Sequence, residues 1–166
     1  MPGVKLDMID RKILSELQAD GRMTNVDLSK KVGISAPPCL RRVRALEENG
    51  FINGYHAQVN GRSLGFEVTV FAMVGLHKQS GPDLADFEER VKGWPLVREC
   101  HMLNGEIDFI LKCVAPDLST FQSFLTDELT ASPNIASVKT SLVIRPSKEL
   151  SGVPFEALEE RWPEGR

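Results

Sequence analysis

Three arginines lie close together directly after a pair of prolines, in the stretch ISAPPCLRRVRALEENG from Ile34 to Gly50. Arg41, Arg42 and Arg44 stand within four residues of one another. Guanidinium groups bind anions such as the phosphates of a nucleic acid, and they also pair with the O6 and N7 acceptors of guanine. The simpler alternative is a solvated basic helix face, which is the usual fate of a charge run.

The two prolines predict that a helix begins at this point. Ser35 is a natural N-cap, and the first-turn amides of a helix have no internal acceptor, so a proline there costs no hydrogen bond. Because Pro38 disfavours the α region at Pro37, we expect the regular helix to begin only at Pro38 and to end at Gly50. The prolines are therefore helix starters that stiffen the approach to a basic face.

The apolar spacing of this helix predicts where its arginines point. The residues expected to face the core are Leu40, Val43 and Leu46. On that phasing Arg41 and Arg44 point away from the core, and Arg42 lies at its edge. The charge is thus expected on the outside of the helix.

Two further helices are expected before this one. The 3,4-spaced apolar positions of residues 6–17 predict the first, which Gly21 ends. Thr24 followed by Asp27 resembles a capping box and predicts a second helix of about two turns, stopped at Gly33. A tight turn between the second and third helices is typical of a helix-turn-helix, whose third helix enters the major groove of DNA.

Charge, helix lengths and turn together favour binding of double-stranded DNA over a merely solvated face. The residues expected to lie at the duplex are Thr24, Lys30, Lys31, Ser35, Pro38, Arg41, Arg42 and Arg44. Lys30 and Lys31 would lie near the DNA backbone, and Ser35 could donate to a phosphate or a base. Phe51–Asn60 follows with partly alternating apolar residues and is expected to form a strand or short ribbon, as in a winged helix-turn-helix.

The second half of the chain alternates strand and helix patterns. We expect a strand over Glu67–Lys78, a helix over 80–93, a hairpin over 96–115 turning at Asn104–Gly105, a helix after Asp117 and a strand over 135–146. Leu118 belongs to the apolar stripe of the second of these helices. The most direct assignment of Phe71, Phe109, Phe121 and Phe124 is to the core. The order is that of a ferredoxin-like βαββαβ sandwich, so the fold class is α+β with a winged helix-turn-helix in front.

Charge also differs between the halves. The net charge of the chain is −3. Residues 1–65 hold ten basic against seven acidic residues, a net +3, whereas residues 66–166 hold ten against sixteen, a net −6. This asymmetry suggests two units with different partners.

Several classes of protein are not indicated. No apolar run approaches the roughly 20 residues that cross a bilayer, and the start MPGVKLDMID has no continuous apolar region of a secretory signal. The histidines His56, His77 and His101 lie far apart, and the cysteines Cys39, Cys100 and Cys113 form no CxxC pair, so neither a metal nor another cofactor is expected. Cys39 is expected to pack as a small buried side chain. No nucleophile elbow, P-loop or paired catalytic carboxylates occur, so we do not expect an enzyme. The missing membrane span, the missing secretory signal and the unpaired cysteines lead us to expect a cytoplasmic protein.

The quoted motifs carry a resemblance to a known family. The run from Leu6 to Asn60, through its DGR-TN turn, its VG-S turn and PCLRRVR-LE-GFI-GY, resembles the DNA-binding domain of the Lrp/AsnC transcription regulators, also called feast/famine regulatory proteins. The stretch ECHMLNGEIDFILKCVAPDLSTF resembles the ligand-sensing domain of the same family, and the resemblance covers about Leu6 to Lys148. It implies a sequence-specific regulator at the nucleoid, a homodimer paired through its sheets and often assembled into octamers. Small effectors, usually amino acids, bind between the dimers.

The resemblance also implies site residues and domains. Those expected to bind the effector are Asn104, Gly105, Glu106, Asp108, Thr140 and Ser141. Gly105 would let backbone amides approach a carboxylate, and Asp108 could hold an α-amino group. The alternative is a simple hairpin turn with Asp108 as an exposed strand residue. The expected domains are 1–60 for DNA binding, 61–66 as linker, 67–150 for effector binding and oligomerisation, and 151–166 as a tail with a short helix over 155–162.

Two other functions share some of these features. A weakly specific DNA-architectural protein would carry the same motifs, and it would bind random DNA as tightly as an operator at equal salt. A metabolite-binding or enzymatic ferredoxin-like module would have no need of a basic third helix.

Overall fold

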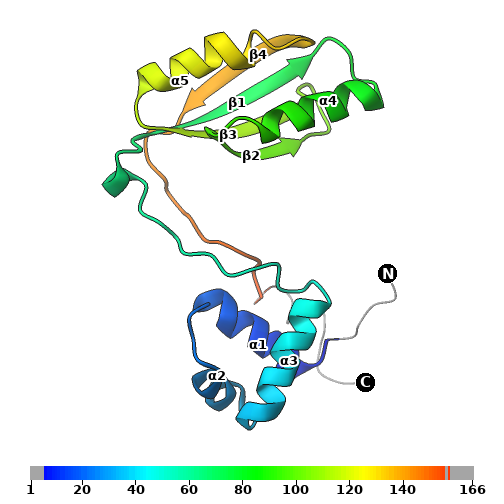
Figure 1. Cartoon of the computed structure of the whole chain (residues 1–166), viewed down its shortest axis with the longest axis vertical. Coiled ribbons are helices and arrows are strands. Elements are labelled where there is room, and N and C mark those ends of the chain that lie inside the picture. Colours follow the sequence, from blue (N-terminus) through cyan, green and yellow to red (C-terminus); the bar gives the residue numbers. More distant parts are fainter. Residues whose placement is uncertain (1–5, 156, 158–166) are drawn as a thin grey trace. The chain divides into compact units, whose positions relative to one another are not determined.

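A computed structural model describes residues 6–155 and residue 157, which divide into two compact units (Figure 1). The first unit runs to Gln58 and resumes at Lys148, and the second is Val59–Ser147. The segment from Lys148 therefore belongs to the first unit, where the side-chain amide of Gln18 both donates to and accepts from the backbone of Val153 (2.8 and 2.9 Å). The helix expected over residues 155–162 lies almost entirely outside the described residues.

Three helices form the first unit, and local capping sets their bounds. Its helices are α1 (Met8–Ala19), α2 (Asn25–Val32) and α3 (Ala36–Glu48). At the start of α2 the Thr24 hydroxyl accepts from the amide of Asp27, and Gly33 ends the helix in the left-handed conformation at φ 80°. These caps confirm the second helix and leave only three residues to turn the chain into α3. Ile13, Leu28, Val32, Cys39 and Leu46 form the core.

The start of α3 differs from the expectation. The helix begins at Ala36 and includes both prolines, because the first helical hydrogen bond is donated by the Cys39 amide to the Ser35 carbonyl (3.2 Å). The positions before that bond need no amide hydrogen, so the bias of Pro38 against the α region at Pro37 is overcome at no hydrogen-bonding cost. Ser35 occupies the N-cap position, but its side chain makes no capping hydrogen bond.

The buried face of α3 also differs. Leu40 was expected in the core but is 40% exposed, and Cys39 is fully buried in its place. Cys39 and Leu46 are seven residues apart and therefore lie on the same side of α3. The buried side of the helix thus begins one residue earlier than expected. Cys39 therefore packs as expected, and burial raises the pKa of its thiol.

No strand forms over Phe51–Asn60, so the expected wing strand is wrong for this described segment. Gly50 at φ 73° ends α3, and the amides of Phe51 and Ile52 both donate to the Leu46 carbonyl. The extended chain then finds no neighbouring strand to pair with, and a strand is stable only within a hydrogen-bonded ladder. The Tyr55 hydroxyl instead donates to Glu47 Oε1 at 2.9 Å.

The second unit has the expected βαββαβ order. Its elements are β1 (Val68–Leu76), α4 (Gly81–Lys92), β2 (Val97–Met102), β3 (Phe109–Ala115), α5 (Leu118–Phe124) and β4 (Ile135–Leu142). A 3₁₀ turn over Arg62–Leu64 precedes β1, and α5 continues as a π turn over Leu125–Leu129. The four strands form an antiparallel sheet in the order β2-β3-β1-β4. β4 ends before the expected stop at Pro146.

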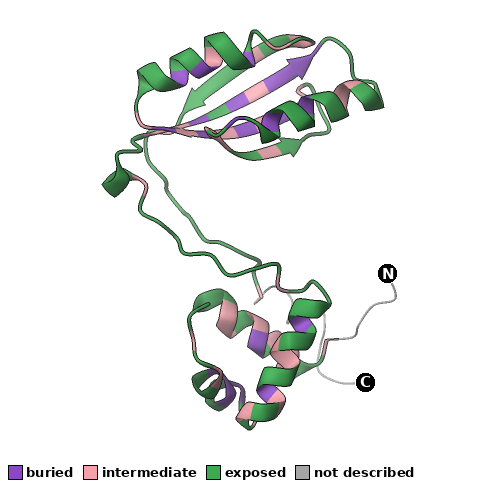
Figure 2. Cartoon of the chain, viewed as in Figure 1, coloured by how far each residue is buried: buried purple, intermediate pink, exposed green. Residues whose placement is uncertain are grey.

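The core of this unit lies between the two helices and one face of the sheet, and its buried residues are concentrated on β1 and β3 (Figure 2). The Phe87 ring of α4 contacts Phe109 with centroids 4.6 Å apart, and Phe121 and Phe124 of α5 are buried. Phe71 was expected in this core but is 36% exposed, since successive strand residues point to opposite faces. Leu118, at the first position of α5, is 56% exposed and is likewise no core residue.

The opposite surface of the sheet, which we call the open face, carries Phe71, Met73, Ile110 and Val114. Phe71 is paired with Lys112, and Met73 with Ile110, in the β1–β3 register. Ile110 and Met73 are partly buried although α4 and α5 pack on the other side. The open face thus combines apolar side chains with the ion pair of Lys112 and Glu99 at 2.8 Å.

Candidate functional site

The side of α3 that faces solvent carries one continuous stripe. We call it the outer face of α3, and it consists of Pro37, Leu40, Arg41, Arg44, Ala45 and Glu48, all exposed and lining a hollow of about 300 Å³. Residues spaced three and four apart lie on one side of a helix, so this set follows from helical geometry. The hollow is open to solvent.

Two arginines of the outer face are unengaged. Arg41 and Arg44 are exposed and form no ion pair with any described residue. Separated by three residues, they project from neighbouring turns on the same side of α3. The sequence-based expectation that both point away from the core is confirmed. The arrangement presents two full positive charges side by side, which suits an extended anion.

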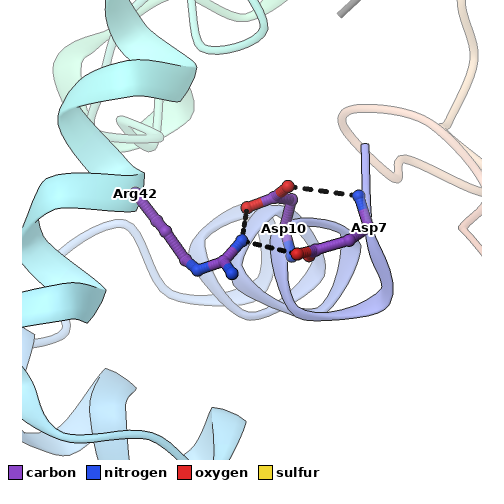
Figure 3. Close-up of polar contacts among 3 residues, drawn as sticks. All are labelled: Asp7, Asp10 and Arg42. Carbon is purple, nitrogen blue, oxygen red and sulfur yellow. Dashed lines mark hydrogen bonds and ion pairs between the residues drawn. The ribbon is translucent and has the colours of Figure 1, made fainter. Parts of the chain in front are cut away.

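Arg42 lies in a different environment. Its Nη1 donates to Asp7 Oδ2 and to Asp10 Oδ1, both at 2.7 Å (Figure 3). These carboxylates also form the capping box of α1, each accepting a hydrogen bond from the backbone amide of the other residue. Arg42 thereby fastens α3 to the start of α1, with its charge neutralised inside the first unit.

Protonation of this cluster follows from its contacts. Burial disfavours the ionised form of Asp7, but the hydrogen bond from the Asp10 amide and the guanidinium of Arg42 outweigh it and lower the pKa of Asp7. The carboxyl of Asp7 is therefore ionised at neutral pH. The available signal in the sequence was the pair Asp7 and Asp10, two acidic residues spaced three apart at the start of a helix, in a chain whose third helix is basic.

The remaining residues expected at the duplex divide into engaged and available groups. Lys31 Nζ pairs with Glu16 Oε2 at 2.7 Å, and this hydrogen bond raises the pKa of Lys31. Lys30 pairs only loosely with Asp27, at 3.8 Å. Thr24 uses its hydroxyl in the cap of α2, Pro38 is half-buried, and Ser35 is exposed. The structure thus gathers Ser35, Arg41 and Arg44 as available groups on and beside α3.

The loop between β2 and β3 is wider than a two-residue turn. It spans residues 103–108, with Asn104, Gly105 and Glu106 exposed. Asp108 holds its base, because Asp108 Oδ2 accepts from the amide of Leu76 (2.7 Å) and the Asp108 amide donates to Val74 (2.9 Å). Asp108 is therefore a half-buried loop anchor rather than an exposed strand residue, and its Oδ1 makes no hydrogen bond with the described part of the chain.

Thr140 and Ser141 do not meet this loop within one chain. They pair with Ala72 and Phe71 of β1, whereas Asp108 bonds four residues further along at Leu76. Four strand residues span about 13 Å, and adjacent residues of a strand point to opposite faces. The loop and this part of β4 therefore lie at different places along the sheet of one chain.

Three other features bear on the class of site. Within residues 6–155 and residue 157, no three His, Cys, Asp or Glu side chains gather as a metal site. None of the helices in that part of the chain is long and apolar enough to cross a membrane. Cys39 and Cys113 are buried free thiols, and Cys100 is partly buried.

Comparison with known proteins agrees with both units. A model of winged helix-turn-helix DNA-binding domains matches residues 6–53, and a model of the Lrp/AsnC ligand-binding domain matches residues 69–153. A leucine-responsive regulatory protein of Rhizobium meliloti is 56% identical over 146 residues, which cover 88% of this chain and 94% of that protein. The Bkd operon transcriptional regulator of Pseudomonas aeruginosa is 44% identical over 141 residues, covering 85% and 92%.

A solved structure extends the similarity to three dimensions. A transcriptional regulator of Neisseria meningitidis, crystallised as a complex with L-methionine, superposes with a TM-score of 0.87 and 34% identity. The match covers 93% of this chain and 99% of that one. Similarity over nearly the whole length includes the three-helix unit and the sheet unit together.

Proposed function

Because the chain belongs to the Lrp/AsnC family of transcription regulators, we propose that Arg41 and Arg44 on the outer face of α3 carry its contact with DNA. Its helix-turn-helix unit binds DNA, and its sheet unit is the ligand-binding domain of the family. The proposal places the outer face of α3 in the major groove, with Ser35 and Lys30 toward the flanking phosphates. Its place of action is then the cytoplasm, at the nucleoid, and its work is binding rather than catalysis.

The observation that carries this proposal is the contrast among the three arginines of α3. Arg42 is neutralised by Asp7 and Asp10, whereas Arg41 and Arg44 are exposed without an ion-pair partner among the described residues. An uncompensated pair of guanidinium groups gains most from a partner of dense negative charge. Guanine O6 and N7 and the backbone phosphates are the groups in a major groove that such side chains bind.

An amino acid is the effector that the loop at Asp108 supports best. Gly105 and its exposed neighbours leave backbone amides open to a carboxylate, and Asp108 Oδ1 is available to an ammonium group. Since Thr140 and Ser141 lie away from this loop in one chain, the proposed pocket takes its second wall from another copy. The L-methionine complex of the Neisseria relative supports an effector of this class.

The open face supports a homodimer. Phe71, Met73 and Ile110 form an apolar strip on a sheet surface opposite to the two helices, and covering it with a second sheet would remove that strip from water. We propose that two chains pair through this face and that dimers assemble further, as far as octamers. Several helix-turn-helix units on one duplex then supply avidity. This avidity compensates for the few base contacts of a single short helix.

DNA footprinting upstream of the protein's own gene, with and without a panel of amino acids, tests the whole proposal. The full chain is expected to protect spaced half-sites, and one amino acid is expected to change the pattern. The variants Arg41→Ala and Arg44→Ala should lose protection while the mass by light scattering stays constant. Equal affinity for random and protected DNA at matched salt would instead indicate an architectural protein.

The effector site has its own test by calorimetry. Asp108→Asn keeps an oxygen that can accept from the Leu76 amide but removes the charge, so it should weaken amino-acid binding without unfolding the loop. Glu128→Gln is the matched control, since it removes a charge from an exposed position of the same unit, on the π turn after α5. Unchanged heat of binding in Asp108→Asn would place the effector elsewhere.

A further inference from the structure

Leu40 is out of place for a core residue and well placed for a recognition residue. It is 40% exposed and lies on the outer face of α3 between Pro37, three residues before, and Arg44, four residues after. A single exposed leucine is ordinary on a protein surface. This one differs because it lines the same hollow as the two unengaged arginines, in the N-terminal half of the helix.

Charge complementarity decides what covers this apolar spot. Arg41 and Arg44, next to Leu40 on the outer face, attract a negatively charged duplex and repel a basic partner surface, and Glu48 limits the attractive region to the first turns of α3. N-terminal residues of a recognition helix reach the base edges. The apolar group that a base edge offers in the major groove is the 5-methyl of thymine.

We propose that Leu40, with Pro37 beside it, contacts a thymine methyl group in each half-site and so determines sequence at a position next to the bases read by Arg41 and Arg44. The inference rests on the proposed function, since it requires α3 to lie in the major groove. It adds a specificity determinant that charge alone cannot supply, because guanidinium groups select guanine and phosphate but not thymine.

The experiment replaces single thymidines by deoxyuridine in a duplex selected by the full-length protein. Deoxyuridine keeps the Watson–Crick edge and lacks only the methyl. Burial of one methyl contributes about 0.8 kcal/mol, so the affected position should weaken binding roughly fourfold, and both half-sites together about fifteenfold. The loss should be the same at two salt concentrations, because a methyl contact releases no counterions.

Variants at position 40 separate direct contact from an effect on DNA shape. Leu40→Ala should bind thymidine and deoxyuridine duplexes equally. Leu40→Met keeps a long apolar side chain, so it should retain most of the discrimination. Leu118→Ala is the matched control, since Leu118 is 56% exposed on α5 of the other unit. It should keep the full fourfold ratio.

Three results overturn the inference. Wild-type binding that is insensitive to deoxyuridine at every position leaves the proposed function standing and removes the methyl contact. Discrimination that persists in Leu40→Ala assigns it to DNA shape or to another residue. A change of oligomeric mass in Leu40→Ala shows that Leu40 is covered by protein. A wild-type chain that binds no duplex at all would instead overturn the proposed function, and the inference with it.

Discussion

The three arginines of α3 should respond differently when DNA binding is measured against salt. Each phosphate contact contributes about 0.9 to the slope of log Kobs against log salt concentration. A dimer has two helix-turn-helix units. If Arg41 binds a phosphate in both half-sites, Arg41→Ala should therefore make the slope shallower by about 1.8. Arg44→Ala should act similarly. Where an arginine binds guanine instead, its loss should cost about 1–3 kcal/mol per half-site and relax sequence preference there.

Arg42→Ala should change stability rather than the slope. The guanidinium of Arg42 is already paired with Asp7 and Asp10 at 2.7 Å, so it has no net charge to offer a phosphate. Its side chain is 30% exposed, and partly exposed ion pairs contribute about 0.2–1 kcal/mol each. Loss of two such pairs should lower the stability by about 1 kcal/mol. In a unit of some 60 residues, this loss lowers the midpoint of thermal unfolding by about 4–8 °C.

Fluorescence anisotropy titrations between about 50 and 200 mM salt measure the slope of log Kobs against log salt concentration. Calorimetric unfolding of the full chain measures the change in the unfolding midpoint. The assignment of Arg41 and Arg44 to DNA is refuted if Arg42→Ala flattens the slope as much as Arg41→Ala does, or if Arg41→Ala and Arg44→Ala change neither the slope nor the affinity. Either outcome would mean that the ion pairs of Figure 3 do not decide which arginine meets DNA.

Three further predictions concern single contacts. The pKa of Asp7 is lowered in the folded chain from about 3.8, so its contribution to stability is present above pH 4 and lost as pH falls through the lower folded value; urea unfolding of Asp7→Asn should show a weaker loss of stability below pH 4 than the wild type. Gln18→Ala should accelerate hydrogen exchange of the Val153 amide, which donates to Gln18 Oε1 at 2.9 Å, whereas Gln18→Glu keeps the acceptor; equal exchange in all three chains would contradict the contact. Burial raises the pKa of Cys113 to about 11, so mass spectrometry after iodoacetamide treatment at pH 8 should find Cys100 alkylated first. Equal alkylation rates of the two cysteines would contradict the burial of Cys113 in the core.

Features set by neighbours in the chain could be predicted from sequence. Thr24 and Gly33 bound α2 because a cap depends on a few adjacent residues. The βαββαβ order followed from alternating patterns with clear turn residues, and Arg41 and Arg44 were correctly placed on the outside of α3. Each of these signals acts within one or two turns of helix or one strand.

Features that depend on packing between elements could not be predicted in this way. The spacing of α3 allows either Cys39 or Leu40 toward the core, and only contact with α1 and α2 selects the cysteine. Asn104–Gly105 has the sequence of a two-residue turn, but the hydrogen bonds of Asp108 to β1 open it into a longer loop. The pairing of Arg42 with Asp7 and Asp10 joins residues more than thirty positions apart.

Chemical methylation of guanine N7 in the bound operator tests most directly whether the outer face of α3 lies in the major groove. Dimethyl sulfate reaches N7 only from that groove. We predict protection of at least one guanine in each half-site by the wild-type chain, and its loss in Arg41→Ala or Arg44→Ala at protein concentrations that restore occupancy. Full occupancy with every guanine N7 still reactive would contradict the account.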